Sequence, residues 1–515
     1  MISREYRALS GMLALATFCG AICLSSAAHG DEGEAAASDA SARSNIHVFA
    51  GLLFVKHGRV GTRSEGPDYF LQTPRGEYGV VYGERRPWQR DEALEALSRN
   101  MVAVRGTLEG ETIRVERIEA IETPRLPEPP PAALVEGNGE FAFALLEKLV
   151  AEQAQKNEPA GNLAVSPYSI STALAMTYAG ARGETASEMA KTLRFTAVPA
   201  PLLHDTFEDL LSVVNANPRA NYFTIHTANR LWAEADFVPE IRPEFREITS
   251  RHYGAEIAPL SFKTDAEAAR GTINQWTREQ TGDKIPQLIP ARGVDNLTRL
   301  VLTNAVHFHG YWESAFDERM TKPADFHVSS DETVEVPTMR QQALLPYLAE
   351  DELQLVALPV RGEMFSMVFA LPRGSKTLAG VRSRIAGRSF THLIRRMEPV
   401  EVELHLPRFT ARSSFELAPT LSALGMPRAF SIDDADFSGI NGQKDLYIGK
   451  VFHEALVDVN ETGVEAAAAT AVVVKRKALP AEVTLVHLDR PFVFALRDNR
   501  TGSIVFLGQV LNPKQ

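Results

Sequence analysis

A proline-rich segment, TPRLPEPPPAAL at residues 123–134, places the strongest limit on how this chain folds. Proline fixes φ and lacks a backbone N–H, so the segment favours an extended, semi-rigid linker over helix or sheet. It predicts a small unit before residue 123 and a large unit over residues 135–515. A chain of 515 residues is also too long for one hydrophobic core, which supports this division.

The first thirty residues have the layout of a secretory signal peptide. Arg4 and Arg7 precede an apolar run at residues 9–24, and small residues follow it. We expect cleavage after Ala28 or Gly30 and a secreted protein, either extracellular or periplasmic. A membrane anchor is the alternative, but the run is short for a bilayer span, and no span is expected in the mature chain.

Cysteine usage and charge exclude several classes of function. Cys19 and Cys23 both lie inside the signal, so the mature chain would have no disulfide, cysteine nucleophile or cysteine metal site. The net charge of −11 argues against a general nucleic-acid binder, which needs a basic face. We expect no cofactor and no metal.

The small unit at residues 46–122 has the pattern of a β domain. Residues 31–45 before it are small, polar and acidic, and predict a disordered spacer. Three strand-like segments, a helix-like segment at 91–98 and two more alternating segments then follow one another. This order matches a small OB-like β-barrel. Because stacking aromatics are few, a structural or partner-docking role is favoured over nucleic-acid or sugar binding.

The large unit lacks the usual catalytic signatures. Helical stretches come early and strands late, which favours an α+β domain with antiparallel sheets. No G-x-S-x-G nucleophile elbow occurs, and HEALV at 453–457 has valine where a zinc helix needs its second histidine. His307 and His309 share a face of one strand-like segment, but without a carboxylate pattern they are interpreted as ordinary histidines. An enzyme is therefore the weaker class.

Six separated stretches carry a resemblance to a known family. They are GNLAVSPYSISTALAMTYAGARGETASEMAKTL, INQWTREQTGDKIPQLIP, LVLTNAVHFHGYWESAFD, VELHLPRF, VFHEALVDVNETGVEAAAATA and RPFVFALRDNRTGSIVFLGQVLNP. In this order they resemble the serpins, a family of serine protease inhibitors, over nearly all of residues 135–515. The resemblance implies an α+β serpin fold: three β-sheets with about eight or nine helices and an exposed reactive loop whose insertion adds a strand.

The composition of ETGVEAAAATAVVVKRKALPAEV, residues 461–483, suits such an insertion. A segment entering a sheet needs small side chains and no proline or bulky charge. The alanine run meets this demand, Val464 is small and uncharged, and Gly463 supplies backbone freedom. The alternative is that the alanine run is a helix. The resemblance implies that the loop hinge consists of Glu461, Gly463, Val464, Ala466, Ala467, Ala468 and Ala469.

The cut bond is placed by the family's spacing from the hinge glutamate. That spacing puts Lys477 before the bond Lys477–Ala478, with Arg476 as the close alternative and Lys475 as a distant one. A basic side chain fits a deep pocket with a carboxylate at its floor, as in trypsin. The protease serine would form an acyl-enzyme, and the freed loop would then insert into the central sheet with the protease attached. The uncut fold would owe its persistence to kinetics.

The resemblance also implies residues that gate insertion without performing chemistry. Ser166, Ser169, Asn304 and His453 correspond to a hydrogen-bonded group, the shutter, beneath the opening strands. Trp312 corresponds to the breach, where insertion starts. Ordinary core packing is the alternative for each of them.

The leading expectation is a secreted, monomeric inhibitor that forms a covalent complex with trypsin-like serine proteases. Two alternatives stay open: a non-inhibitory serpin that acts as a binding or scaffold protein, and a cross-class inhibitor of cysteine proteases. The N-terminal β unit lies outside the usual family pattern, and its role is left open.

Overall fold

The computed structural model describes residues 46–58, 66–73, 76–82, 91, 94, 97, 101–110, 112–120, 132–155, 161–216, 222–255, 257–464 and 483–514. The chain divides into two compact units, Met1–Thr123 and Pro124–Gln515. The predicted signal at 1–30, the spacer at 31–45 and residues 123–131 of the predicted linker lie outside the described residues. Among the described residues, no helix is both long and apolar enough to cross a bilayer.

The first unit is a closed five-stranded barrel in the order β1-β2-β3-β5-β4. β1 pairs antiparallel with both β2 and β4, and β3 pairs parallel with β5. Alternate residues of the strands fill the barrel core, among them Leu53, Leu71, Val102 and Ile113. The strands are β1 Ile46–Gly58, β2 Gly66–Thr73, β3 Gly76–Tyr82, β4 Met101–Glu109 and β5 Thr112–Ala120. They lie where the sequence predicts strands, while the OB-like role of the unit stays a prediction.

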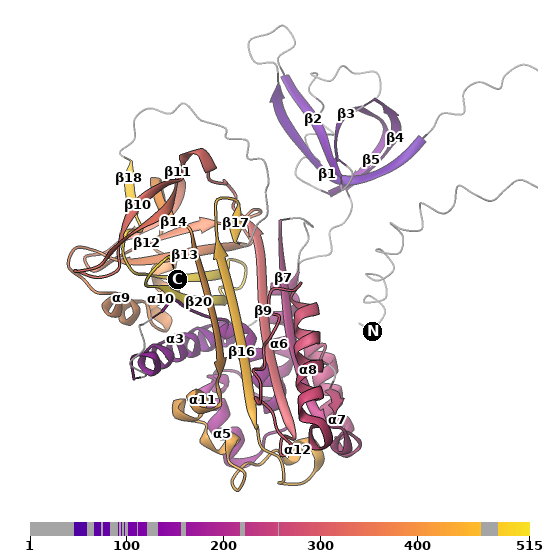
Figure 1. The fold of residues 1–515 in the computed structure, drawn as a ribbon. Helices are drawn as coiled ribbons and strands as arrows, with labels where there is room; N and C mark the ends of the chain where they lie inside the picture. The colour runs from indigo at the N-terminus through magenta and orange to yellow at the C-terminus, as the bar shows by residue number, and fades with distance from the viewer. Residues whose placement is uncertain are drawn as a thin grey trace, which may run out of the picture. The chain divides into compact units, whose positions relative to one another are not determined.

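The second unit is built around a six-stranded sheet, here called the central sheet, in the order β15-β16-β17-β9-β7-β8. β7 and β9 are long antiparallel neighbours, and β9 runs parallel to β16. Figure 1 shows β7, β9 and β16 side by side along the length of the unit. The strands are β7 Phe223–Glu234, β8 Ile257–Leu260, β9 Leu300–Tyr311, β15 Phe409–Glu416, β16 Lys450–Val459 and β17 Gly463–Val464.

A second sheet of nine strands packs with the central sheet around the main core. Its long strand β11 pairs with β10 through its first half, then with β14, and with β12 at its end, which joins the parts into one hydrogen-bonded sheet. The strands are β6 Leu163–Val165, β10 Lys322–His327, β11 Thr333–Ala349, β12 Leu353–Pro359, β13 Phe365–Pro372, β14 Glu398–Pro407, β18 Thr484–His487, β19 Phe492–Asp498 and β20 Ile504–Val510.

Helices cover the sheets and begin where their sequences favour it. α4 has Ser166 as N-cap and proline at its first position, an arrangement that satisfies the free N–H groups of the first turn. α3 begins at Ala132, inside the predicted linker, because alanine and leucine there favour helix; the linker ends earlier than predicted. The helices are α3 Ala132–Gln155, α4 Pro167–Tyr178, α5 Gly183–Thr192, α6 Leu203–Asn215, α7 Pro243–Tyr253, α8 Phe262–Gln280, α9 Leu378–Ile385, α10 Arg388–Ile394, α11 Ala418–Leu424 and α12 Ser438–Asn441.

Candidate functional site

The central sheet parts along one line, here called the seam, between β9 and β16. The two strands pair directly from Val301 and Lys450 up to Val306 and Ala455. Beyond that point β17 lies between them, with Val464 opposite Gly310 of β9 and Val459 of β16. The predicted hinge residues Gly463 and Val464 therefore already occupy one end of the seam, near the β17 label in Figure 1.

A tight turn carries the chain from β16 back into β17. The side chain of Asn460 accepts hydrogen bonds from the backbone N of Thr462 at 3.0 Å and from the backbone N of Gly463 at 3.3 Å. The Thr462 hydroxyl donates to the same oxygen at 2.7 Å. An asparagine that bonds its own chain two residues on mimics a backbone turn. This turn fixes the direction in which the hinge enters the seam.

The backbones of β17 and β9 approach each other so closely that position 463 requires glycine. A Cβ atom there would lie 2.0 Å from the carbonyl oxygen of Gly310 and 2.8 Å from the Cα of Tyr311. Both are backbone atoms of β9, so no side-chain movement would relieve the clash. The prediction from sequence gave Gly463 backbone freedom; the structure shows that absence of a side chain is what matters.

Trp312 closes the same end of the seam and is fully buried. Its indole Nε1 donates to the carbonyl of Asn460 at 2.9 Å, and its backbone N donates to the carbonyl of Thr462 at 3.0 Å. The tryptophan predicted at the breach is therefore bonded directly to the turn that leads into the hinge. Its gating role stays a prediction.

Glu461 holds the hinge turn through an ion pair in which the carboxylate is buried and the arginine is partly exposed. Its side chain is 4 % exposed, and its Oε1 accepts from Arg408 Nε at 2.8 Å and Nη2 at 2.6 Å, and from the Thr321 hydroxyl. Burial raises the pKa of Glu461, but hydrogen bonds from Arg408 and Thr321 outweigh it and lower the pKa overall. Arg408 and Thr321 were not predicted; the matched stretch VELHLPRF contains Arg408, and its charge was the available signal.

The four predicted shutter residues meet beneath the directly paired part of the seam. Asn304 of β9 and His453 of β16 stand opposite one another, and His453 Nδ1 lies 2.6 Å from Asn304 Oδ1. The amide of Asn304 also donates to the Ser169 hydroxyl, and Ser166 caps the helix that carries Ser169. The group links both sides of the seam to the first turn of α4.

The contacts of His453 fix its tautomer. The backbone N of Ser166 donates to Nε2 at 3.1 Å, so Nε2 is the acceptor and Nδ1 carries the proton that is donated to Asn304. His453 is fully buried, and burial lowers its pKa from 6.5 to about 3. The imidazole is therefore neutral at physiological pH and serves as a fixed hydrogen-bond relay across the seam.

Asn229 of β7 is a member of this group that sequence reasoning missed. Its Oδ1 accepts from Asn304 Nδ2 at 2.6 Å and from the Ser169 hydroxyl at 2.9 Å. It stands opposite Asn304 in the antiparallel register of β7 and β9. A single asparagine within a strand sequence gives no local signal, because its partner lies on a distant segment.

The face of the central sheet opposite the main core is covered by α8 and the segment after it. A small cluster there includes Trp232 of β7, Val301 and Ala305 of β9, and Phe452 of β16. The Arg230 guanidinium lies 4.9 Å from the ring centre of Trp232 and 5.1 Å from that of Trp276 on α8. This double cation–π contact ties α8 to β7.

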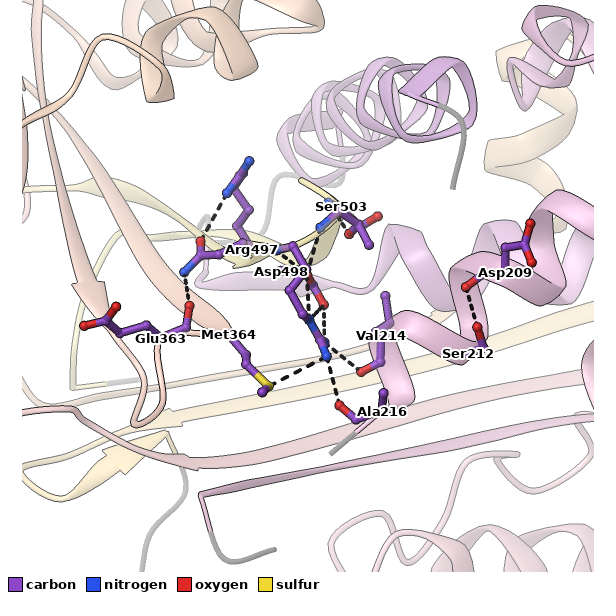
Figure 2. A network of polar contacts seen from close by, with 12 residues as sticks. Asp209, Ser212, Val214, Ala216, Glu363, Met364, Arg497, Asp498 and Ser503 are labelled. Atoms are coloured by element: carbon purple, nitrogen blue, oxygen red, sulfur yellow. Dashed lines mark hydrogen bonds and ion pairs between the residues drawn. The ribbon is translucent and has the colours of Figure 1, made fainter. Parts of the chain in front are cut away.

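A separate polar network caps the end of α6 (Figure 2). Asp498, fully buried at the β19–β20 turn, accepts from the backbone N of Arg500 at 2.8 Å and pairs with its guanidinium at 2.5 Å. The guanidinium donates to the carbonyls of Val214 at 3.2 Å and Ala216 at 2.9 Å. A cation at a helix C-terminus satisfies carbonyls that lack a helical partner. This network is structural and takes no part in the hinge.

Several predicted site residues lie outside the described residues: Ala466, Ala467, Ala468, Ala469, Arg476, Lys477 and Ala478. The histidines interpreted as ordinary are placed by the structure in β9. His307 is 8 % exposed and stands opposite His226, and burial lowers the pKa of His309.

Comparison with known proteins supports the fold and narrows the function. The sequence model of the serpin (serine protease inhibitor) family matches residues 136–513. Leukocyte elastase inhibitor of Bos taurus is 39 % identical over 70 % of this chain and 95 % of its own length. Leukocyte elastase inhibitor A of Mus musculus is 37 % identical over 74 % and 99 % respectively. The solved structure of Serpin48 from the insect Tenebrio molitor superposes with a TM-score of 0.65 at 30 % identity, covering 74 % of this chain and 98 % of that one.

These relatives correct the expected function and location. The prediction of a secreted inhibitor of trypsin-like proteases is wrong, because the relatives are named as inhibitors of leukocyte elastase. The basic residues 475–477 do not decide the target, since the bond that a protease cuts is not fixed by charge alone. The extracellular or periplasmic location, inferred from the first thirty residues, is withdrawn on the same comparison.

The α+β serpin fold predicted from the motifs is confirmed by the superposition. With the family matched across residues 136–513, the relatives covered almost end to end, and the hinge, tryptophan and shutter contacts in place along one seam, the chain belongs to the serpin family of serine protease inhibitors.

Proposed function

We propose that this chain inhibits a serine protease of the elastase type by trapping it covalently through residues 465–482. The proposal rests mainly on the position of the hinge in the central sheet. β17 pairs with both β9 and β16 at the end of the seam between these two parallel strands. A strand that continues β17 between two parallel neighbours would be antiparallel to both. The names of the relatives suggest the class of target.

The register of β17 predicts which residues of β9 and β16 each later residue would lie opposite after insertion. Val464 stands opposite Gly310 and Val459, and every further residue moves one position down β9 and β16. Continued in this way, Thr470 arrives between Asn304 and His453, which are paired with each other in the uncut form. Its hydroxyl is both donor and acceptor, so it suits the two shutter side chains that it would separate.

The pleat of the same strand matches the sizes of the arriving side chains. Side chains alternate between the two faces of a strand. Val464 faces the main core, so residues 466, 468, 470, 472 and 474 would face that core as well. Residues 465, 467, 469, 471 and 473 would face the α8 side of the sheet. The three in the middle are alanine, and Val473 would stand opposite Val301 of the cluster beneath α8. The middle of the predicted hinge therefore places its smallest side chains on that face.

The proposed chemistry needs a peptide bond within residues 465–482 that a protease can cut, next to a strand that can be extended. The protease serine attacks a carbonyl of the segment and forms an acyl-enzyme. Cutting releases the end that continues β17, and insertion replaces the parallel ladder between β9 and β16 with two antiparallel ladders, one on each side of the new strand. The attached protease is carried along with the inserting strand and its active site is distorted, so it can no longer activate water and the ester persists.

The bond itself remains to be located. The predicted bond Lys477–Ala478, with Arg476 as the alternative, lies outside the described residues. An elastase has a small specificity pocket, which favours an uncharged residue before the cut. The same segment offers Val472, Val473, Val474 and Ala478 in that class.

The test is to incubate the full chain with leukocyte elastase and separate the products on a denaturing gel. An adduct of the summed mass that survives SDS supports the proposal, and mass spectrometry of the released C-terminal peptide identifies the bond. Elastase with its catalytic serine blocked is the matched control and should give no adduct. Rapid cleavage with no adduct at any enzyme ratio would contradict the proposal and indicate a substrate.

A further inference from the structure

A pair of histidines joins the last two strands at the edge of the second sheet. β18 is the edge strand and follows directly after residues 465–482. It pairs with β14 through four positions, and His405 of β14 stands opposite His487 of β18. Val402, Leu404 and Val486 are buried. The two histidines therefore occupy the outer face of this strand pair.

The two imidazole rings lie at the separation of metal ligands. Their centroids are 4.9 Å apart. Zn²⁺ binds imidazole nitrogen at about 2.0–2.1 Å in tetrahedral geometry, which places the ring centres of two histidine ligands about 5 Å apart. The side chains are 24 % and 37 % exposed, so a hydrated ion could reach them.

A carboxylate accompanies one nitrogen of each ring. Glu403 Oε1 lies 2.8 Å from His405 Nε2, and Asp489 Oδ2 lies 3.7 Å from His487 Nδ1. Histidine ligands of metals usually donate their second N–H to a carboxylate, which fixes the tautomer and strengthens the ligand nitrogen. Glu403 therefore leaves Nδ1 of His405 for a metal, whereas 3.7 Å is too long for a hydrogen bond, so both nitrogens of His487 are open to one.

The acids beside the two histidines are paired with arginines. Arg340 pairs with Glu403 at 2.7 Å and Arg490 pairs with Asp489 at 2.8 Å, so each arginine is matched by one acid. His327 is the third histidine nearby, and its backbone N donates to the carbonyl of Asp489 at 2.7 Å. Arg373 lines the same pocket as His487 and Arg490 and adds one positive charge there; its guanidinium donates to the Glu350 carbonyl at 2.9 Å.

We propose that His405 and His487 form a binding site for a divalent transition cation, with Zn²⁺ as the best-fitting ion and water completing its coordination. The bound ion links β14 to β18, the strand that follows residues 465–482. Because β18 is short and lies at an edge, this link sets how firmly that strand is held. The inference does not depend on the identity of the protease.

The test is calorimetric titration of the full chain with ZnCl₂, followed by melting with and without zinc. We expect a site of one zinc per chain that is weakened at least tenfold in His405→Gln and in His487→Gln. The zinc-dependent rise in Tm should be lost in both variants. His252→Gln is the matched control, because His252 with the exposed Asp205 and Glu208 is another group whose ligand atoms lie close together; it should change the affinity less than twofold.

Unchanged zinc affinity in His405→Gln, or its loss in His252→Gln, would overturn the assignment. X-ray absorption of the zinc-loaded full chain gives a readout that does not rely on variants. Two imidazole ligands are expected around the zinc, and a spectrum with one or none would reject the site even if a variant failed to fold.

Discussion

Replacing Gly463 with alanine tests whether the hinge must lie in the seam. The new Cβ would meet the Gly310 carbonyl oxygen at 2.0 Å and Tyr311 Cα at 2.8 Å. β9 cannot retreat, because it is paired along its length with β7. The hinge must therefore leave the seam. Exposure of Val464, now 1 % exposed, and loss of its ladder bonds together cost about 3–5 kcal/mol.

That cost corresponds to a shift of about a hundredfold or more in the equilibrium between seated and released hinge. Hydrogen exchange at residues 460–464 should accelerate accordingly in Gly463→Ala. Trp312 fluorescence should shift to longer wavelength, because the indole loses its partner at the Asn460 carbonyl. With elastase, the variant should be cut but should yield little SDS-stable adduct.

Gly271→Ala is the matched control. Gly271 lies in α8 with nothing within 4 Å of an added Cβ, so the change should stabilise the fold by about 0.5–1 kcal/mol and leave trapping intact. Slow exchange at residues 460–464 and full adduct yield in Gly463→Ala would refute the account of the hinge.

Three further predictions concern the shutter. Asn304→Ala removes the acceptor for the buried Nδ1–H of His453 and should destabilise the uncut form by about 2–4 kcal/mol. Thermal melting should show this loss, and size-exclusion chromatography should show polymers that result from premature insertion. An unchanged melting temperature with full inhibition would contradict the prediction. Burial lowers the pKa of His453 from 6.5 to about 3, so as the pH falls the unfolded state takes up a proton on this histidine before the folded state does. The free energy of unfolding should therefore fall by up to about 1.4 kcal/mol per pH unit between pH 6.5 and pH 3. His453→Gln should show a shallower pH slope, and an equal slope would argue against burial of this imidazole. Thr470→Val should leave the uncut Tm unchanged but reduce the gain in Tm on cutting, because the hydroxyl that would replace the bond between Asn304 and His453 is gone; an equal gain in both proteins would show that Thr470 does not arrive there.

Much of the fold could be predicted because its signals are local or spread over long motifs. Alternation in the strands of the barrel and the ordered stretches of the large unit each point to one arrangement. The end of the linker was misjudged, since Ala132, Ala133 and Leu134 follow prolines and yet have high helix propensity. At these three residues the propensity for helix outweighed the influence of the preceding prolines, which favour an extended chain.

The candidate site was predicted only where a motif contains it. Asn304 and His453 lie in matched stretches, whereas Asn229 and Thr321 have no local pattern and are recruited by strand register and by a turn. The specificity was misjudged for a different physical reason. Charge marks where a trypsin-like enzyme would cut, but it does not report which protease a loop presents itself to.

The cluster beneath α8 sets a size limit on anything that joins the central sheet. It draws residues from both banks of the seam: Trp232, Val301 and Ala305 on one side and Phe452 on the other. Arg230 contacts the indole rings of Trp232 and Trp276 and so holds α8 against β7. Because α8 stays with β7, a strand added between β9 and β16 would move Phe452 of β16 away from α8. In the projected register the newcomer next to Phe452 is Ala471, and next to Ala305 it is Ala469. A larger side chain at either position would displace α8 before the new strand had paired with β9 and β16. The packing of α8 on the uncut sheet therefore limits these two positions to side chains about as small as alanine.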